Sequence, residues 1–228
     1  MAPFGASRAG LMSVAVDDIP DSAVYRWPVD EGSGQTLTDE LQNEDITTNF
    51  ENWVSGSQYV GENAKSFDGV DDEGSTSDSL PEITVSEDFS IEIWADLGSV
   101  SSGEVFLYHH PSDEDRVGFG IDQDDGSKVA FGVFDGTTRE LQADIPSGLA
   151  QFVLTWDSGN SNISAFVNST ETTDGGNLNF TSETKNELSV GHRENRQHTE
   201  VVVDLIQPHG ETLSQSQVDD LYNDHPST

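Results

Sequence analysis

The feature that most constrains the fold of this chain is a recurring alternation of apolar and other residues over short runs. Clear examples are Phe89–Trp94, Val129–Val133 and Val201–Ile206. A side-chain period of two places alternate residues on opposite faces of a β-strand. Asp-Gly pairs at 68–69 and 125–126 separate such runs, and this pair is a strong signal for a tight hairpin turn. Many short strands joined by such turns predict an all-β sandwich or barrel.

One helix is predicted, near the C-terminal end. Ser214 and Gln217 have the spacing of a capping box, and Leu213 and Val218 have that of a hydrophobic staple. Pro226 ends the helical pattern. We expect this short helix to cover an edge of a sheet.

The length of the chain, 228 residues, is one that a single β-sandwich often reaches. We predict an N-terminal arm over residues 1–22 and one domain over residues 23–228. The arm is rich in Gly and Ala, and two interpretations stay open: a loosely packed terminus, or a segment that docks on neighbouring subunits. Its apolar run, Leu11–Val16, is shorter than the apolar core of a signal peptide, so we expect no classical one.

The charge balance is extreme, because 43 Asp and Glu face only 9 Lys and Arg, a net charge of −34. Aromatic residues inside alternating runs argue against disorder, and the spread of charge along the chain argues against an acidic tail. We therefore interpret it as adaptation to molar salt, where charge repulsion is screened. Binding to nucleic acid through phosphates requires basic patches, so we expect none. No apolar stretch is long enough to predict membrane insertion.

Several segments together resemble the LamG-like jelly-roll family of the concanavalin A-like superfamily. The resemblance covers about residues 23–223, and its motifs occur in the family's order. They are Trp27–Gly34 with Asp39, Ser66–Asp72, Phe89–Trp94, Phe152–Asp157, Ala165–Asn168, Leu188–Gly191 and Val203–Tyr222, with Ser169 in place of the family's glycine. The resemblance implies a two-sheet antiparallel jelly-roll sandwich, here with a short C-terminal helix.

The resemblance also implies a structural Ca²⁺ that ties an early loop to the final strand. Asp204 is the first candidate for a ligand, followed by Asp39. Asp68, with its neighbours Asp71 and Asp72, forms an acidic turn that offers the oxygen ligands Ca²⁺ prefers. The competing interpretation is an ordinary acidic surface, which supplies Asp everywhere in such a chain.

Glycan binding is the activity that the resemblance implies most directly, because relatives stack sugar rings on aromatic side chains at edge loops or on a sheet face. The candidate platforms are Trp53, Tyr59 and Tyr108, with Trp94 as a weaker one. Trp53 lies in a polar stretch, so we expect it to be exposed. Trp27, Trp94 and Trp156 lie in alternating runs, and we expect them in the core.

Catalysis is not expected from this sequence. Glycosidases need two carboxylates at the scissile bond. Glu92 stands alone on its strand, because Trp94 takes the next position on the same face. Hydrolase nucleophile motifs and zinc-binding motifs are missing, and the six histidines have no ligand spacing.

The leading hypothesis is a non-catalytic recognition or adhesion module that binds a cell-surface glycan or glycoprotein. We expect it on a virion surface or outside the cell, as a spike, turret or fibre head of a haloarchaeal virus whose arm contacts neighbouring subunits. The first alternative is a purely structural protein that decorates or cements an assembly. The second is a divergent glycan-cleaving enzyme that uses Glu92.

Overall fold

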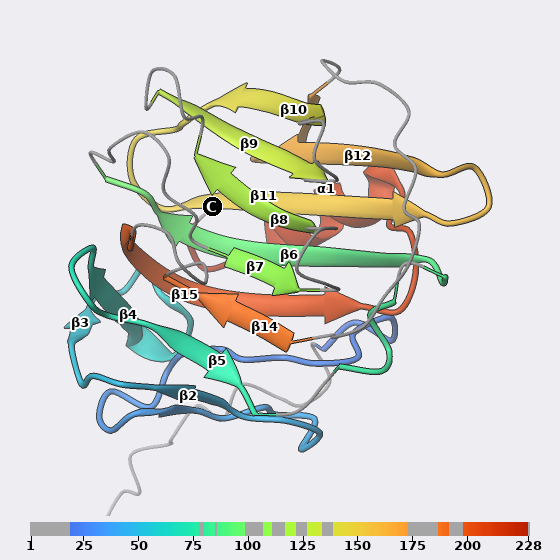
Figure 1. Ribbon diagram of the computed structural model, residues 1–228. Helices are drawn as coiled ribbons and strands as arrows, with labels where there is room; N and C mark the ends of the chain where they lie inside the picture. The colour runs from blue at the N-terminus through green and yellow to red at the C-terminus, as the bar shows by residue number, and fades with distance from the viewer. Residues whose placement is uncertain are drawn as a thin grey trace, which may run out of the picture.

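The computed structural model describes two packed antiparallel sheets and one C-terminal helix (Figure 1). The described residues are 19–77, 80–84, 86–98, 107–110, 117–121, 127–133, 139–172, 187–191 and 198–227. Most of the predicted arm, residues 1–18, and the Asp-Gly pair at 125–126 lie outside them. The predicted all-β sandwich is confirmed.

The first layer is a seven-stranded sheet in the order β13-β12-β11-β6-β15-β4-β3. Its central strands, β6 and β15, are among the longest in the described chain, and they pair antiparallel with a β-bulge between Val203 and Leu205. The strands are β3 (Trp53–Ser55), β4 (Asn63–Asp68), β6 (Phe89–Asp96), β11 (Ala150–Asp157), β12 (Asn162–Val167), β13 (Thr170–Thr172) and β15 (Glu200–His209).

The second layer is an eight-stranded sheet in the order β1-β2-β5-β14-β7-β8-β9-β10. Figure 1 shows it lying across the seven-stranded sheet. The strands are β1 (Thr36–Leu37), β2 (Ile46–Thr48), β5 (Gly74–Thr76), β7 (Leu107–His110), β8 (Val117–Ile121), β9 (Lys128–Val133), β10 (Arg139–Asp144) and β14 (Glu187–Val190).

The main core lies between the two sheets, as the alternation predicts. On β6 the side chains of Phe89, Ile91 and Ile93 belong to this core, and on β11 those of Phe152 and Leu154 do. Burying large apolar side chains stabilises each by roughly 1.5–3 kcal/mol, so this layer is the main source of stability. The expected burial of three tryptophans is confirmed, since Trp27, Trp94 and Trp156 are 0%, 1% and 2% exposed.

The helix α1 (Gln215–Asp224) begins at the predicted capping box: Ser214 accepts the backbone N–H of Gln217, whose side chain reaches back to Ser214. It covers not a sheet edge, as expected, but the outer face of the seven-stranded sheet. There Val218 and Leu213 form a second apolar cluster, with Val153 of β11 and Phe166 of β12. The strands of this sheet are therefore buried on both faces where the helix crosses them.

A short 3₁₀ turn, η2 (Val60–Glu62), connects β3 to β4. None of the helices in the described segments has the length and apolar character that crossing a membrane requires.

Candidate metal cluster and binding pocket

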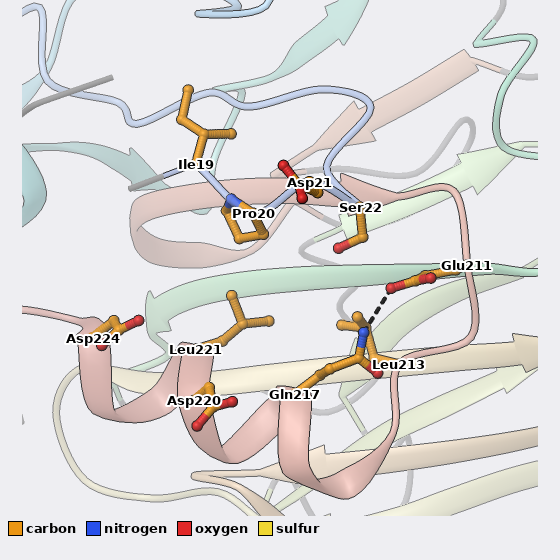
Figure 2. Close-up of a pocket in the computed structure, with 10 residues that line it drawn as sticks. All are labelled: Ile19, Pro20, Asp21, Ser22, Glu211, Leu213, Gln217, Asp220, Leu221 and Asp224. Carbon is orange, nitrogen blue, oxygen red and sulfur yellow. Dashed lines mark hydrogen bonds between the residues drawn. The ribbon is translucent and has the colours of Figure 1, made fainter. Parts of the chain in front are cut away.

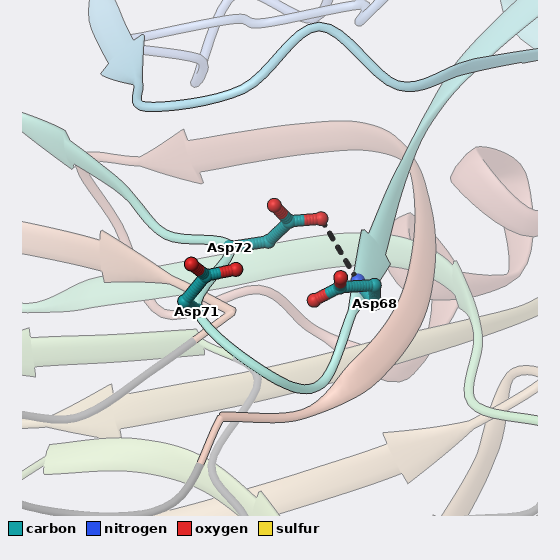
Figure 3. Close-up of side chains that lie close together, drawn as sticks. All are labelled: Asp68, Asp71 and Asp72. Atoms are coloured by element: carbon teal, nitrogen blue, oxygen red, sulfur yellow. Dashed lines mark hydrogen bonds between the residues drawn. The ribbon is translucent and has the colours of Figure 1, made fainter.

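Three carboxylates gather at the turn that follows β4. Oxygen atoms of Asp68, Asp71 and Asp72 all lie within 4.8 Å of one another (Figure 3). The turn folds tightly because Gly69 has a φ of +72° and lies against the backbone of Glu200, where a Cβ would stand 2.9 Å from the Glu200 nitrogen. The local sequence thus forces the three side chains together.

The protein holds these carboxylates with few donors. The backbone N–H of Asp68 donates to Asp72 Oδ2 at 3.0 Å, and that of Val70 donates to Asp68 Oδ1 at 2.8 Å. Asp72 is buried, while Asp68 and Asp71 are exposed. Burial raises the pKa of the Asp72 carboxyl above its ordinary value, and the nearby charges of Asp68 and Asp71 add to this. The negative charges of these close carboxylates repel one another, and a bound metal cation could offset that repulsion.

The other two predicted metal ligands lie in different surroundings. Asp39 is buried, and its two oxygens accept the backbone N–H groups of Arg26, Leu41, Asn43 and Glu44. Within the described residues, Asp39 is thus the centre of a hydrogen-bonded turn. Metal ligation by Asp39 stays a prediction.

Asp204 lies at the β15 bulge, where its Oδ1 accepts the backbone N–H of Val60 at 2.9 Å. Its Oδ2 lies 2.8 Å from His225 Nε2 at the end of α1. Burial raises the pKa of Asp204, and the hydrogen bond to His225 opposes that effect. The residue joins an early loop and the C-terminal helix to the final strand through hydrogen bonds. Metal ligation by Asp204 stays a prediction.

The predicted aromatic platforms are less open than expected. Trp53, on the edge strand β3, is half-buried, and its Nε1 donates to the Gly34 carbonyl at 3.1 Å. Tyr59, just before η2, is also half-buried. Tyr108 belongs to β7, where its backbone pairs with Ser189 of β14, but its side chain lies outside the described residues. A ligand-binding role for all three stays a prediction.

Lys65 explains why Trp53 is held in place, and the sequence interpretation did not single it out for any role. The residue is fully buried in β4, and its Nζ donates to the carbonyls of Gly34 at 2.8 Å and Phe50 at 3.1 Å. The same Nζ lies 4.3 Å from the Trp53 ring centroid, a cation–π arrangement. Burial lowers the pKa of Lys65 to about 8.

A pocket of about 370 Å³ opens over the outer face of the seven-stranded sheet (Figure 2). Residues 19–22 form one wall and helix α1 forms the other. Its apolar lining comes from Ile19, Pro20, Leu213 and Leu221, and its polar lining comes from Asp21, Ser22, Glu211, Gln217, Asp220 and Asp224.

The carboxylates of the pocket differ in their partners. Glu211 accepts a hydrogen bond from Gln217 Nε2 at 2.6 Å. Within the described residues, Asp21, Asp220 and Asp224 make no hydrogen bond or ion pair. No local sequence pattern marks this pocket, because its two walls lie almost 190 residues apart in the chain.

Glu92 lies in the same sheet as a buried acceptor. It is 1% exposed, and its Oε1 accepts Trp94 Nε1 at 3.0 Å and Gln151 Nε2 at 2.8 Å. Its Oε2 accepts Gln207 Nε2 at 3.3 Å. The pKa of Glu92 is lowered, because these donors and His209 outweigh the effect of burial.

Comparison with known families decides the classification. The family model described as the concanavalin A-like lectin/glucanases superfamily, Laminin_G_3, matches residues 67–219, which is about two thirds of the chain. The chain belongs to this superfamily. This confirms the resemblance read from its motifs. No curated protein sequence matches the chain.

Several solved structures share the fold of this chain at low sequence identity. Domain 4 of AbnA, an extracellular GH43 arabinanase from Geobacillus stearothermophilus solved with arabinotriose, has a TM-score of 0.71 and 15% identity over 88% of this chain and 98% of that domain. Trypanosoma rangeli sialidase has a TM-score of 0.67 and 14% identity over 92% of this chain. The chain spans 34% of that sialidase.

A third similar structure is the binding domain of botulinum neurotoxin DC in complex with rat synaptotagmin II. It has a TM-score of 0.68 and 12% identity over 89% of this chain and 51% of that one. At sequence identities this low, the structural similarity shows a shared fold alone.

Proposed function

We propose that this domain is a recognition module that binds glycans without cleaving glycosidic bonds, and that the ligand lies in the pocket between residues 19–22 and α1. The pocket is the observation that carries the proposal. Its volume, about 370 Å³, is within the range of small-molecule sites, roughly 300–1,000 Å³.

The lining has the chemistry that a sugar requires. Carboxylate oxygens can accept hydrogen bonds from hydroxyl groups, and three of the four carboxylates have no partner of their own among the described residues. Leu213 and Leu221 offer apolar surface to the C–H groups of a ring. The superfamily and the arabinotriose complex of a similar domain support this ligand class.

The absence of glycosidase activity is also part of the proposal. Glu92, the residue that a divergent glycan-cleaving enzyme would use, is covered and accepts three side-chain donors. A general acid must reach the leaving oxygen of the substrate, and a buried, fully bonded carboxylate cannot do so.

The test is calorimetric titration of the protein with neutral oligosaccharides, starting with arabinotriose, in 2 M and 0.2 M NaCl. We expect saturable binding that weakens at least about tenfold in Leu221→Ala and in the double variant Asp220→Asn, Asp224→Asn, since each lost contact removes about 1–1.5 kcal/mol. Glu87→Gln, an exposed acid outside the pocket, is the matched control. Equal affinity in all variants would place the ligand elsewhere, with Trp53 and Tyr59 as the next residues to change. No binding would favour the structural, assembly-cementing role.

We also propose that Ca²⁺ occupies the cluster of Asp68, Asp71 and Asp72, where it would hold the turn after β4. The oxygens lie close enough for one ion, and Asp72 has an oxygen that accepts no hydrogen bond within the described residues. The net charge of −34 supports a working environment of molar salt. Display on a haloarchaeal virion and contact with neighbouring subunits through residues 1–22 stay predictions.

A further inference from the structure

Three side chains far apart in the sequence form a chain of polar contacts that ends in the pocket. Ser22 Oγ lies 2.9 Å from His209 Nδ1, and His209 Nε2 lies 3.7 Å from Glu92 Oε2. His209 and Glu92 are 0% and 1% exposed, whereas Ser22 is half-exposed and lines the pocket. A hydroxyl, an imidazole and a buried carboxylate thus stand in the order that activates a serine nucleophile.

The surrounding hydrogen bonds set the protons of this group. Trp94, Gln151 and Gln207 donate to Glu92, which keeps it a carboxylate. Gln207 Nε2, a donor, lies 3.4 Å from His209 Nε2, and this contact favours a proton on Nδ1 that is donated to Ser22 Oγ. The Glu92 carboxylate favours the other tautomer, with the proton on Nε2. Activation of Ser22 requires that second tautomer, because Nδ1 must be free to accept the Ser22 proton. The 3.7 Å contact is long for a hydrogen bond, as such contacts often are before a substrate binds.

The backbone around Ser22 provides hydrogen-bond donors for an oxyanion. Its carbonyl accepts the Gly210 N–H at 2.9 Å, and Ala23 N–H donates to the Pro20 carbonyl at 3.0 Å, so the segment is held against β15. Among the described residues, the N–H groups of Asp21 and Ser22 have no hydrogen-bond acceptor. Figure 2 shows the Ser22 hydroxyl pointing into the space between the segment and α1. Free N–H groups beside a nucleophile can stabilise an oxyanion.

We propose that Ser22, His209 and Glu92 hydrolyse short acyl esters of hydroxyl groups, with an O-acylated sugar in the pocket as the substrate class. Ser22 Oγ would attack the ester carbonyl while its proton passes to His209 Nδ1. The C–O bond to the alcohol would then break, and the departing oxygen would take that proton. Water would add to the acyl-serine with His209 as base, releasing the carboxylic acid and restoring Ser22. The sugar as the alcohol part rests on the proposed function; the acyl chemistry does not.

The experiment uses the full chain in molar NaCl. Hydrolysis of p-nitrophenyl acetate and release of acetate from O-acetylated arabino-oligosaccharides are measured, together with labelling by a fluorophosphonate that mass spectrometry maps to a residue. We expect labelling at Ser22 and ester turnover that falls to background in Ser22→Ala. Glu92→Gln, which keeps the size of the side chain, should lower turnover about 100-fold or more, in keeping with the loss of the carboxylate in a serine triad. Ser57→Ala, an exposed serine, should behave as wild type.

The outcomes separate this proposal from a structural role and from glycan binding. Lower melting temperatures in Ser22→Ala and Glu92→Gln, with no turnover and no labelled Ser22 in the wild type, would overturn it. Turnover that persists in a folded Ser22→Ala would overturn it as well. If arabinotriose binds while no ester is cleaved, the proposed function stands without this inference. If simple esters are cleaved while no sugar binds, the acyl chemistry stands and glycan recognition fails.

Discussion

The buried ammonium of Lys65 makes the stability of this protein depend on pH in a window where few other groups titrate. Burial lowers its pKa from 10.5 to about 8, and the cation lies against the ring of Trp53 with two carbonyl acceptors among the described residues. Between these two values the unfolded chain binds more protons than the folded chain. Stability therefore rises with pH across this window, the reverse of what a surface lysine in an ion pair gives.

The size of the effect follows from the shift. Relative to neutral pH, a shift from 10.5 to about 8 adds about 1.4 kcal/mol to the free energy of unfolding at pH 9 and about 2.5 kcal/mol at pH 10. Because burial is the main cause, molar salt should change the gain little. Burial also raises the pKa of the Tyr25 hydroxyl, so the folded state loses stability once free tyrosines ionise above about pH 10. Measurements should stop there.

Urea unfolding of the wild type and of Lys65→Met, followed by tryptophan fluorescence at pH 7, 9 and 10, isolates the contribution. The substitution keeps the length of the side chain and removes the proton. We expect the stability difference between wild type and variant to move in favour of the wild type by the stated amounts. Lys128→Met, at a side chain 33% exposed beside the exposed Asp144, is the control for losing one positive charge. Parallel pH curves for wild type and Lys65→Met would refute the reasoning.

The remaining predictions concern the metal cluster, the helix and the buried carboxylate. Removing Ca²⁺ with a chelator should lower the melting temperature of the wild type but not of Asp72→Asn, and identical scans would leave Asp68, Asp71 and Asp72 without an ion. Ser214→Ala should destabilise the fold by about 1 kcal/mol in urea unfolding, since it removes the cap of α1. Val218→Ala should cost about 1–3 kcal/mol, because this residue of α1 is fully buried against Val153 and Phe166 of the sheet; a change under 0.3 kcal/mol would show that α1 packs loosely. The lowered pKa of Glu92 stabilises the fold above the ordinary carboxyl range, so this contribution should disappear as acid titration passes below that range, and Glu92→Gln should flatten the acid limb of the stability curve.

Local patterns in the sequence predicted the β-sandwich and the C-terminal helix. The alternation at Phe89, Ile91 and Ile93 places these side chains on one face wherever the strand goes, since the period of a strand is two. The capping box at Ser214 involves residues three apart, so it needs no tertiary contact to form. The cluster after β4 was within reach for the same reason, because Asp68, Asp71 and Asp72 belong to one turn.

Residues whose role depends on a distant segment were beyond this kind of reasoning. The alternation predicted that Trp94 is buried, but not that Tyr222 of α1 and His225, which follows the helix, are the side chains that stack on its ring. Lys65 is one of three lysines in the chain. Its apolar neighbours, Ala64 and Phe67, were the only sequence signal that its side chain is buried. Trp53 was expected to be exposed for its polar neighbours, yet Lys65 and Gly34 hold it half-buried.

What the sequence by itself determined is therefore the all-β class, the longer strands with their inward faces, and the C-terminal helix, because side-chain period, caps and turns act over a few residues. The tertiary structure alone decided which surfaces became sites. Ser22 meets His209 across 187 positions, and Asp204 meets Val60 across 144, because residues 23–27 and strand β4 both pair antiparallel with β15. The pocket and its serine exist only through that long-range pairing, and no local pattern encodes it.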